Sequence, residues 1–188
     1  MINLASTPFK TIQGEGRYLG VPMTFVRFAG CSVGCPKCDT NYGHRLSMSS
    51  KEIASHCAKL GLEWVWITGG EPTDQMDGLI DLIGLLAESG FKVALASSGI
   101  RECPRVHFLS ISPHTPDFVQ RVGTEIKLVP GLNGLKISDI DISTIQFAYR
   151  YLMPMNGSDS SIQNCIDFVS NTSGWLLTTQ AHKAWRVQ

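Results

Sequence analysis

The run WVWITGG at residues 64–70 is the feature that most narrows what this chain can fold into. Its side chains are apolar, aromatic or β-branched, which predicts a strand that is buried on both faces. Strands of that kind belong to parallel sheets whose faces are covered by helices. Residues 77–90 follow with apolar side chains at helical spacing, from Asp77 at the start to Gly90 at the end, and predict such a covering helix.

The same alternation of strand and helix patterns continues along the chain. Further strands are predicted at residues 24–30, 92–99, 107–113, 124–129 and 147–154, and further helices at residues 47–61 and 158–174. Ser49 or Ser50 can cap the helix at 47–61, and Gly61 can end it. The last helix is expected to begin at one of three polar residues, Ser158, Asp159 or Ser160.

This order of elements predicts an α/β fold with a parallel sheet and right-handed crossovers. About six strands suit a compact, partial (β/α)6 barrel better than a closed eight-stranded barrel, which needs more chain. The 188 residues show no internal repeat and no long linker, so we expect one domain over residues 1–188. The active site of such a fold lies at the carboxyl ends of the strands.

Composition limits the partners of the chain. The net charge is +0 and only 17% of residues are charged, so no basic field indicates nucleic-acid binding. The first residues lack the pattern of a signal peptide. The most apolar later stretch, residues 79–91, is interrupted by Asp81 and Glu88 and is too short to span a bilayer. We therefore expect a cytoplasmic protein that acts on a small molecule, without nucleic acid or membrane partners.

The chemically suggestive motifs follow the predicted strands. Three of the six cysteines, Cys31, Cys35 and Cys38, come directly after the first strand, and TGGEP at residues 68–72 ends the second. The SSG and SPH motifs end the next two strands. Because clustered cysteines in a cytoplasmic protein indicate a metal site or catalysis, we expect this loop to bind a metal centre.

Two kinds of metal centre are compatible with three clustered thiolates. A structural zinc site would need a fourth ligand, which His44 or a more distant residue would have to supply. An iron–sulfur cluster with one iron open to an exogenous ligand needs only the three cysteines. The scattered Cys57, Cys103 and Cys165 are expected to be small buried side chains.

Cys-x3-Cys-x2-Cys after a first strand, followed by Gly-Gly-Glu-Pro after the second, resembles the pattern of radical S-adenosylmethionine (radical SAM) enzymes. The resemblance implies a 4Fe–4S cluster on the three cysteines and SAM as the source of a 5′-deoxyadenosyl radical. No side chain beyond the cofactors is then needed as a catalytic residue. The implied SAM contacts are Lys37, Cys38, Asp39, Gly69, Gly70, Glu71, Ser98, Ser112 and His114.

Further blocks resemble one family within this group, the 7-carboxy-7-deazaguanine synthases. They are the Gln-Gly-Glu-Gly stretch at residues 13–16 with Arg27 downstream, Thr40 after the third cysteine, and residues 180–183 near the end. The resemblance spans residue 11 to about residue 185. It implies Mg²⁺ on Thr40 and the ring contraction of 6-carboxy-5,6,7,8-tetrahydropterin with release of ammonia. The implied substrate contacts are Ile12, Gln13, Gly14, Glu15, Arg27, Thr68 and His182.

The resemblance also implies SAM regeneration, a reductase or flavodoxin-type electron donor, and a homodimer. The chain departs from the family pattern at three strand ends: it has Ser97-Ser98-Gly99 where an acidic residue is common, His114 in place of lysine, and Met153 in place of a polar residue. Two alternatives remain open at this stage. One is a radical SAM activase of a glycyl radical enzyme, which would need neither the Gln-Gly-Glu-Gly block nor Thr40, and the other is a zinc-binding structural module.

Overall fold

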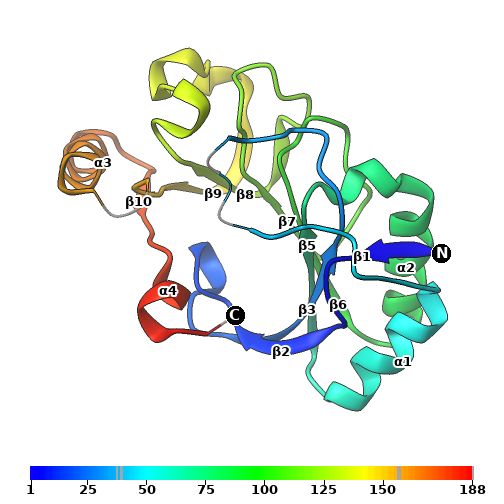
Figure 1. The fold of residues 1–188 in the computed structure, drawn as a ribbon. Helices are drawn as coiled ribbons and strands as arrows, with labels where there is room; N and C mark the ends of the chain where they lie inside the picture. Colours follow the sequence, from blue (N-terminus) through cyan, green and yellow to red (C-terminus); the bar gives the residue numbers. More distant parts are fainter. Residues whose placement is uncertain (37, 39, 156–157, 188) are drawn as a thin grey trace.

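The computed structural model describes residues 1–36, 38, 40–155 and 158–187 (Figure 1). In this part of the chain the strands form one ten-stranded sheet in the order β10-β9-β8-β7-β6-β5-β3-β1-β4, with β2 paired to β3. The strands are β1 Ile2–Leu4, β2 Phe9–Ile12, β3 Pro22–Phe28, β4 Leu46–Met48, β5 Trp64–Gly69, β6 Lys92–Ser97, β7 Phe108–Ile111, β8 Val122–Leu128, β9 Gln146–Leu152 and β10 Leu176–Leu177. The α-helices are α1 Ser50–Leu60, α2 Met76–Glu88, α3 Asp159–Asn171 and α4 Ala181–Trp185. The 3-10 helices are η1 Gly16–Tyr18, η2 Pro72–Gln75, η3 Leu132–Gly134, η4 Ile137–Asp139 and η5 Ile142–Thr144.

The parallel sheet predicted from the sequence is confirmed. The predicted strands correspond to β3 and to β5 through β9, and each is parallel to its neighbour. The short β10 continues this parallel order beside β9, whereas β1, β2 and β4 add antiparallel pairs at the other end. These short strands were not expected, because segments of two to four residues carry too little pattern to be recognised.

The predicted helix at 47–61 starts later than expected. Its first residues belong to β4, where Met48 pairs with Ile2 of β1, and α1 begins at Ser50. Ser49 is the cap: its hydroxyl accepts from the Glu52 backbone N–H, and the Glu52 carboxylate accepts from the Ser49 backbone N–H. Gly61 ends the helix at a φ of 69°, as the sequence predicts.

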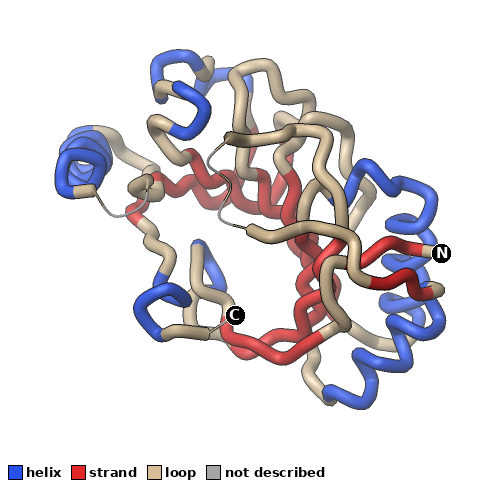
Figure 2. The backbone as a smooth tube through the Cα atoms, viewed as in Figure 1, coloured by secondary structure: helices blue, strands red, loops and turns tan. Residues whose placement is uncertain are grey.

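The alternation of strand and helix is incomplete. Residues 98–107, between β6 and β7, and residues 112–121, between β7 and β8, contain no helix, and only 3-10 turns link β8 to β9. The strands curve as an open arc, with α1 and α2 packed outside one side of it and α3 beside the β9–β10 end (Figures 1 and 2). The short α4 lies in the opening of the arc, near the loop that follows β2 (Figure 1). This architecture agrees with the expected compact, partial barrel-like core.

The two faces of the sheet carry different side chains, because successive residues of a strand point to opposite faces. On the outer face Val26, Ile67 and Leu95 pack beneath the helices in the main hydrophobic core. On the inner face Trp66 and Phe108 form a second, aromatic cluster with neighbours from the adjoining strands. The inner face becomes polar toward the carboxyl ends of the strands, which is where the candidate site lies.

In the described part of the chain no helix combines the length and the apolar character that crossing a bilayer requires.

Candidate active site

The inner face carries a row of polar positions across neighbouring strands. Arg27 on β3 pairs in register with Thr68 on β5, which places both side chains on the same face near the carboxyl ends. Farther along the sheet Ser110 on β7 pairs with Glu125 on β8. Lys127 lies two residues beyond Glu125 and therefore on the same face. The parallel strands thus bring charged and hydroxyl groups from distant parts of the chain to one edge.

The loop after β3 is joined to the loop after β5 by backbone hydrogen bonds. Gly70 N–H donates to the Phe28 carbonyl at 3.1 Å, and Glu71 N–H donates to the Gly30 carbonyl at 3.0 Å. A Cβ on Gly70 would overlap the Gly30 carbonyl oxygen. The glycine is therefore required by the close approach of the two loops, a reason that the sequence analysis did not foresee.

A cavity of about 240 Å³ lies between these two loops and the neighbouring strand ends. Its walls include the three clustered cysteines and most of the residues that the sequence analysis assigned to SAM. The cysteines and predicted SAM contacts that line this cavity are Cys31, Cys35, Cys38, Gly69, Gly70, Glu71, Ser98, Ser112 and His114. Lys37 and Asp39, also predicted to contact SAM, lie outside the described residues.

A second cavity of about 140 Å³ adjoins the first. It is lined by all of the predicted substrate contacts, Ile12, Gln13, Gly14, Glu15, Arg27, Thr68 and His182. Six residues line both cavities: Glu15, Thr40, Thr68, Ala96, Lys127 and Gln180. Thr40, predicted to hold Mg²⁺, is thus at the junction. The two predicted sets of contacts occupy neighbouring spaces that share a wall.

The donor set of the first cavity fits an iron–sulfur cluster. The three cysteines are free thiols, and all of them line the same cavity. The pKa of the Cys35 thiol is raised, chiefly by burial, and the nearby Cys31 and Cys38 add to this effect. A hydrogen bond from Asn133 opposes it. Among the described residues no three His, Cys, Asp or Glu side chains form a group that could hold a metal ion. A cluster does not need such convergence, because its thiolates bind different irons.

His44, the nearest fourth ligand that the zinc alternative could use, does not reach the cysteines. His44 is directed to Ser47, whose hydroxyl lies 3.1 Å from Nε2, and it does not line the cavity of the cysteines. Cys57 and Cys165 are buried in the hydrophobic core, as expected, while Cys103 is only partly buried.

Known proteins give a consistent comparison. Over 178 residues the chain is 30% identical to the 7-carboxy-7-deazaguanine synthase of Bacteroides thetaiotaomicron, covering 93% of each chain. It is 27% identical to the enzyme of that name from Haemophilus influenzae, covering 93% of this chain and 89% of the other. The crystal structure of QueE from Escherichia coli matches with a TM-score of 0.74 and 25% identity, covering 95% of this chain and 93% of that one. No protein-family model matches the chain.

The chain belongs to the 7-carboxy-7-deazaguanine synthase family. The resemblance inferred from the motifs is thereby confirmed, as is the α/β fold expected from it.

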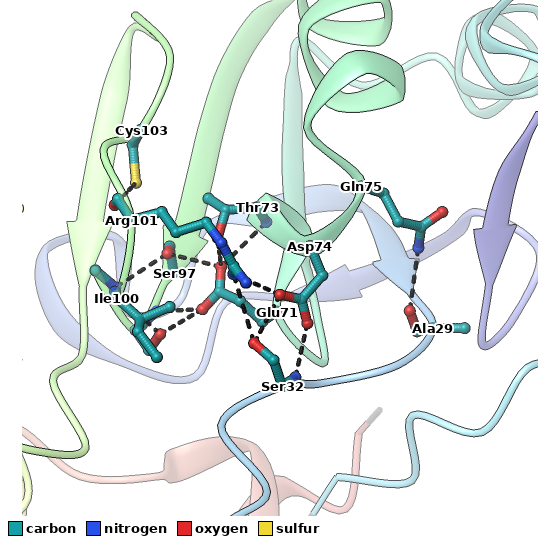
Figure 3. A network of polar contacts seen from close by, with 12 residues as sticks. Ala29, Ser32, Glu71, Thr73, Asp74, Gln75, Ser97, Ile100, Arg101 and Cys103 are labelled. Carbon is teal, nitrogen blue, oxygen red and sulfur yellow. Dashed lines mark hydrogen bonds and ion pairs between the residues drawn. The ribbon is translucent and has the colours of Figure 1, made fainter.

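The serines that set this chain apart from the family pattern bind the carboxylate of Glu71 (Figure 3). Its Oε1 accepts from the Ser97 hydroxyl at 2.8 Å and from the backbone N–H and hydroxyl of Thr73. Its Oε2 accepts from the Ser98 backbone N–H at 2.8 Å and from the Ser98 hydroxyl. The buried Glu71 therefore ties the end of β6 to the loop after β5, and it does so with donors that an acidic residue would not provide.

A second departure from the family pattern, His114, lies beside the cysteine loop. Its Nδ1 is 2.6 Å from the Sγ of Cys35. Burial lowers the pKa of His114, against a smaller opposite effect of Glu71, so the neutral imidazole is favoured. Met153, the third departure, lines the first cavity together with Val129 and contributes apolar surface there.

Further polar contacts at the site were missed by the sequence analysis. Lys127 forms an ion pair with Glu15, with 2.7 Å between Nζ and Oε2. Asp74 binds Ser32 of the cysteine loop and forms an ion pair with Arg101 (Figure 3). The alternation in TEIKLV was a usable signal for Lys127, because it places two charges on one face of an otherwise buried strand.

The C-terminal segment closes over the N-terminal loop of the family motif. Ala181 N–H donates to the Gly14 carbonyl at 3.0 Å, and Gly16 N–H donates to the Thr178 hydroxyl at 2.8 Å. A Cβ on Gly14 would overlap the ring of His182. The two ends of the chain therefore form one wall of the second cavity, although they are remote in sequence.

Proposed function

We propose that this chain is a radical SAM enzyme that converts 6-carboxy-5,6,7,8-tetrahydropterin to 7-carboxy-7-deazaguanine and ammonia, a step of queuosine-type biosynthesis. The observation that carries the proposal is the pair of adjoining cavities, one walled by three thiols and one by the Gln13–Glu15 loop and Arg27. A radical generated in the first space would arise beside a substrate in the second. The proposed domain is the whole of residues 1–188.

Each cavity has groups suited to its proposed contents. Cys31, Cys35 and Cys38 would hold a 4Fe–4S cluster, and the glycines and serines around them would bind SAM. When bound, these cofactors would supply the radical chemistry. Arg27 has the planar guanidinium that matches the carboxylate of the pterin. Thr40, at the junction of the cavities, offers a hard oxygen to Mg²⁺, which commonly keeps several waters.

Several properties remain part of the proposal. They are a cytoplasmic location, electron supply from a reductase or flavodoxin-type donor, regeneration of SAM, and a homodimer. The size of the assembly is measured directly by light scattering of the purified protein.

The deciding experiment is anaerobic incubation of the reduced, cluster-loaded protein with the carboxy-tetrahydropterin, SAM and Mg²⁺, followed by mass analysis of the products. We expect 7-carboxy-7-deazaguanine and ammonia in equal amounts, and no product with a Cys35→Ala variant. A cluster-loaded protein that cleaves SAM but forms no deazaguanine would sink the assignment. A glycyl radical formed on a large partner protein would then point to the activase alternative.

A further inference from the structure

Lys127 carries a charged group into the wall shared by the two cavities. It lies on the inner face of β8, its side chain is 6% exposed, and it lines both spaces. Its Nζ donates to the Oε2 of Glu15 at 2.7 Å, and the Glu15 side chain is 16% exposed. Removing two charges from water costs several kcal/mol per ion, so burial of this pair is not explained by stability alone.

Glu15 is held from two further sides. Its Oε1 accepts a hydrogen bond from Gln180 Nε2 at 3.1 Å, and its backbone N–H donates to the Oε1 of Gln13 at 3.1 Å. The carboxylate is therefore fixed by β8 and by the C-terminal segment, and the backbone that carries it is fixed within its own loop. A carboxylate has about four acceptor positions, and the contacts with Lys127 and Gln180 use two of them. The two remaining acceptor positions match two adjacent N–H donors of a ligand.

The surrounding charges keep the pair ionised. Burial acts to raise the pKa of Glu15, but Lys127 and the hydrogen bond from Gln180 outweigh it, and the pKa is lowered. Burial acts to lower the pKa of Lys127, but Glu15 and Glu125 outweigh it, and the pKa is raised. Glu125 has its own donors, the Arg17 backbone N–H at 2.6 Å and the Ser110 hydroxyl at 2.7 Å.

We propose that Lys127 is a substrate-positioning residue, which holds Glu15 as a fixed anionic acceptor for the amino-pyrimidine edge of the pterin at the junction of the two cavities. This inference rests on the proposed function. The amino group and the neighbouring ring N–H of a pterin form a paired donor edge, which a carboxylate accepts in a bidentate manner. Lys127 acts on the substrate through Glu15, and it fixes which side of the ring faces the cysteine cavity.

The proposal predicts a pH dependence that appears only when the lysine charge is removed. In the Lys127→Met variant, burial is left to raise the pKa of Glu15, so substrate affinity should fall as pH is lowered through the neutral range. The wild-type affinity should not show this fall, because its Glu15 stays ionised. Among the described residues, the other titratable or charged groups that face the pair are Glu125 on β8, Arg27 on β3 and His182 on α4. They are present in both proteins, so the difference between the two profiles isolates Glu15.

The test measures equilibrium binding of 6-carboxy-5,6,7,8-tetrahydropterin and steady-state kinetics between pH 6 and about pH 8.5, a range that brackets neutrality. Lys127→Met should weaken binding about 10- to 100-fold at neutral pH, as loss of one partner of a buried pair does. Lys127→Arg should restore much of the affinity. Lys51→Met, an exposed lysine on α1, is the matched control and should behave as the wild type.

A double-mutant cycle separates positioning from general damage to the fold. If Lys127 acts through Glu15, the Lys127→Met change should add little in a Glu15→Gln background, and the pH dependence should disappear there. Lys127→Gln, which still hydrogen-bonds the carboxylate, is the second neutral variant and should reproduce the pH shift if the methionine variant folds poorly. Circular dichroism and thermal melting establish folding for each protein.

The outcomes separate this inference from the function on which it rests. A wild-type protein that neither binds nor converts the pterin defeats the proposed function and this inference with it. Two results with an active wild type would overturn this inference alone. In the first, Lys127→Met keeps the affinity for the pterin within twofold of the wild type. In the second, Lys127→Met lowers that affinity equally at every pH, and its effect adds to that of Glu15→Gln.

Discussion

Asp74 accepts two hydrogen bonds from Ser32, one from the backbone N–H and one from the hydroxyl, each at 2.7 Å. Ser32 directly follows Cys31, so a side chain from η2 fixes the start of the cysteine loop. Arg101, from the segment after β6, forms an ion pair with the same carboxylate (Figure 3). The position of the proposed cluster ligands therefore depends on residues that are not ligands themselves, and such second-sphere contacts commonly orient the ligands of a metal site.

Asp74→Ala should loosen this loop without unfolding the protein. It removes hydrogen bonds to a charged, partly exposed group, which should lower the free energy of unfolding by about 1–2 kcal/mol. The reconstituted cluster should be lost to an iron chelator several-fold faster than in the wild type, as followed by visible absorbance. Asp77→Ala, at an exposed position in the first turn of α2, is the control. Equal rates of loss in the two variants would show that Asp74 does not order the loop.

Cys35→Ala should abolish cluster binding, because two thiolates cannot replace three. Iron and sulfide analysis of the anaerobically purified protein, together with its brown colour, reports the result. Cys103→Ala is the matched control, since burial raises the pKa of that thiol to about 11 and it does not line the cavity. A Cys35→Ala protein with a full complement of iron would contradict the proposed ligand set.

Thr40→Ala should retain the cluster and weaken the response to Mg²⁺. The hydroxyl at the junction of the cavities is the only proposed protein ligand of that ion, so the half-saturating Mg²⁺ concentration should rise roughly tenfold, equivalent to about 1.4 kcal/mol. Iron content and a magnesium titration of product formation measure the two effects separately. Product formation that needs no added Mg²⁺ in either protein would remove the metal from the proposal.

Gly14→Ala should damage the wall between the chain ends. The added methyl group would overlap the ring of His182, and overpacking of this kind costs about 1–3 kcal/mol. Thermal melting should show the loss, and a second change, His182→Ala, should restore part of the stability by making room. If the double variant is no more stable than Gly14→Ala alone, the contact with His182 is not what excludes a side chain at residue 14.

The predictable part of the fold follows from patterns that are local in sequence. The apolar run at 64–70 and the capping box at Ser49 and Glu52 report their own conformation, so β5 and α1 were found close to their true bounds. β4 and β10 were not found, because strands this short exist only through the partner they pair with. The missing helices after β6 and β7 were also not foreseen.

For the candidate site, closely spaced motifs in the sequence predicted which residues line it. The residues that hydrogen-bond to them come from distant parts of the chain and were not predicted. Nothing near Glu71 in the chain shows that Ser97 and Ser98 bind its carboxylate. Lys127 is separated from Glu15 by more than a hundred residues, and no local pattern connects them.

The sequence by itself determined the parallel α/β order, the cysteine triad and the family motif, since these depend on the periodicity and spacing of nearby residues. Only the tertiary structure decided that the two sets of motif residues wall adjoining cavities, and that Lys127 and Glu15 meet between them. The physical reason is that contacts across a curved sheet depend on strand register and on the path of the chain ends. Those are properties of the whole packed chain, and no single segment encodes them.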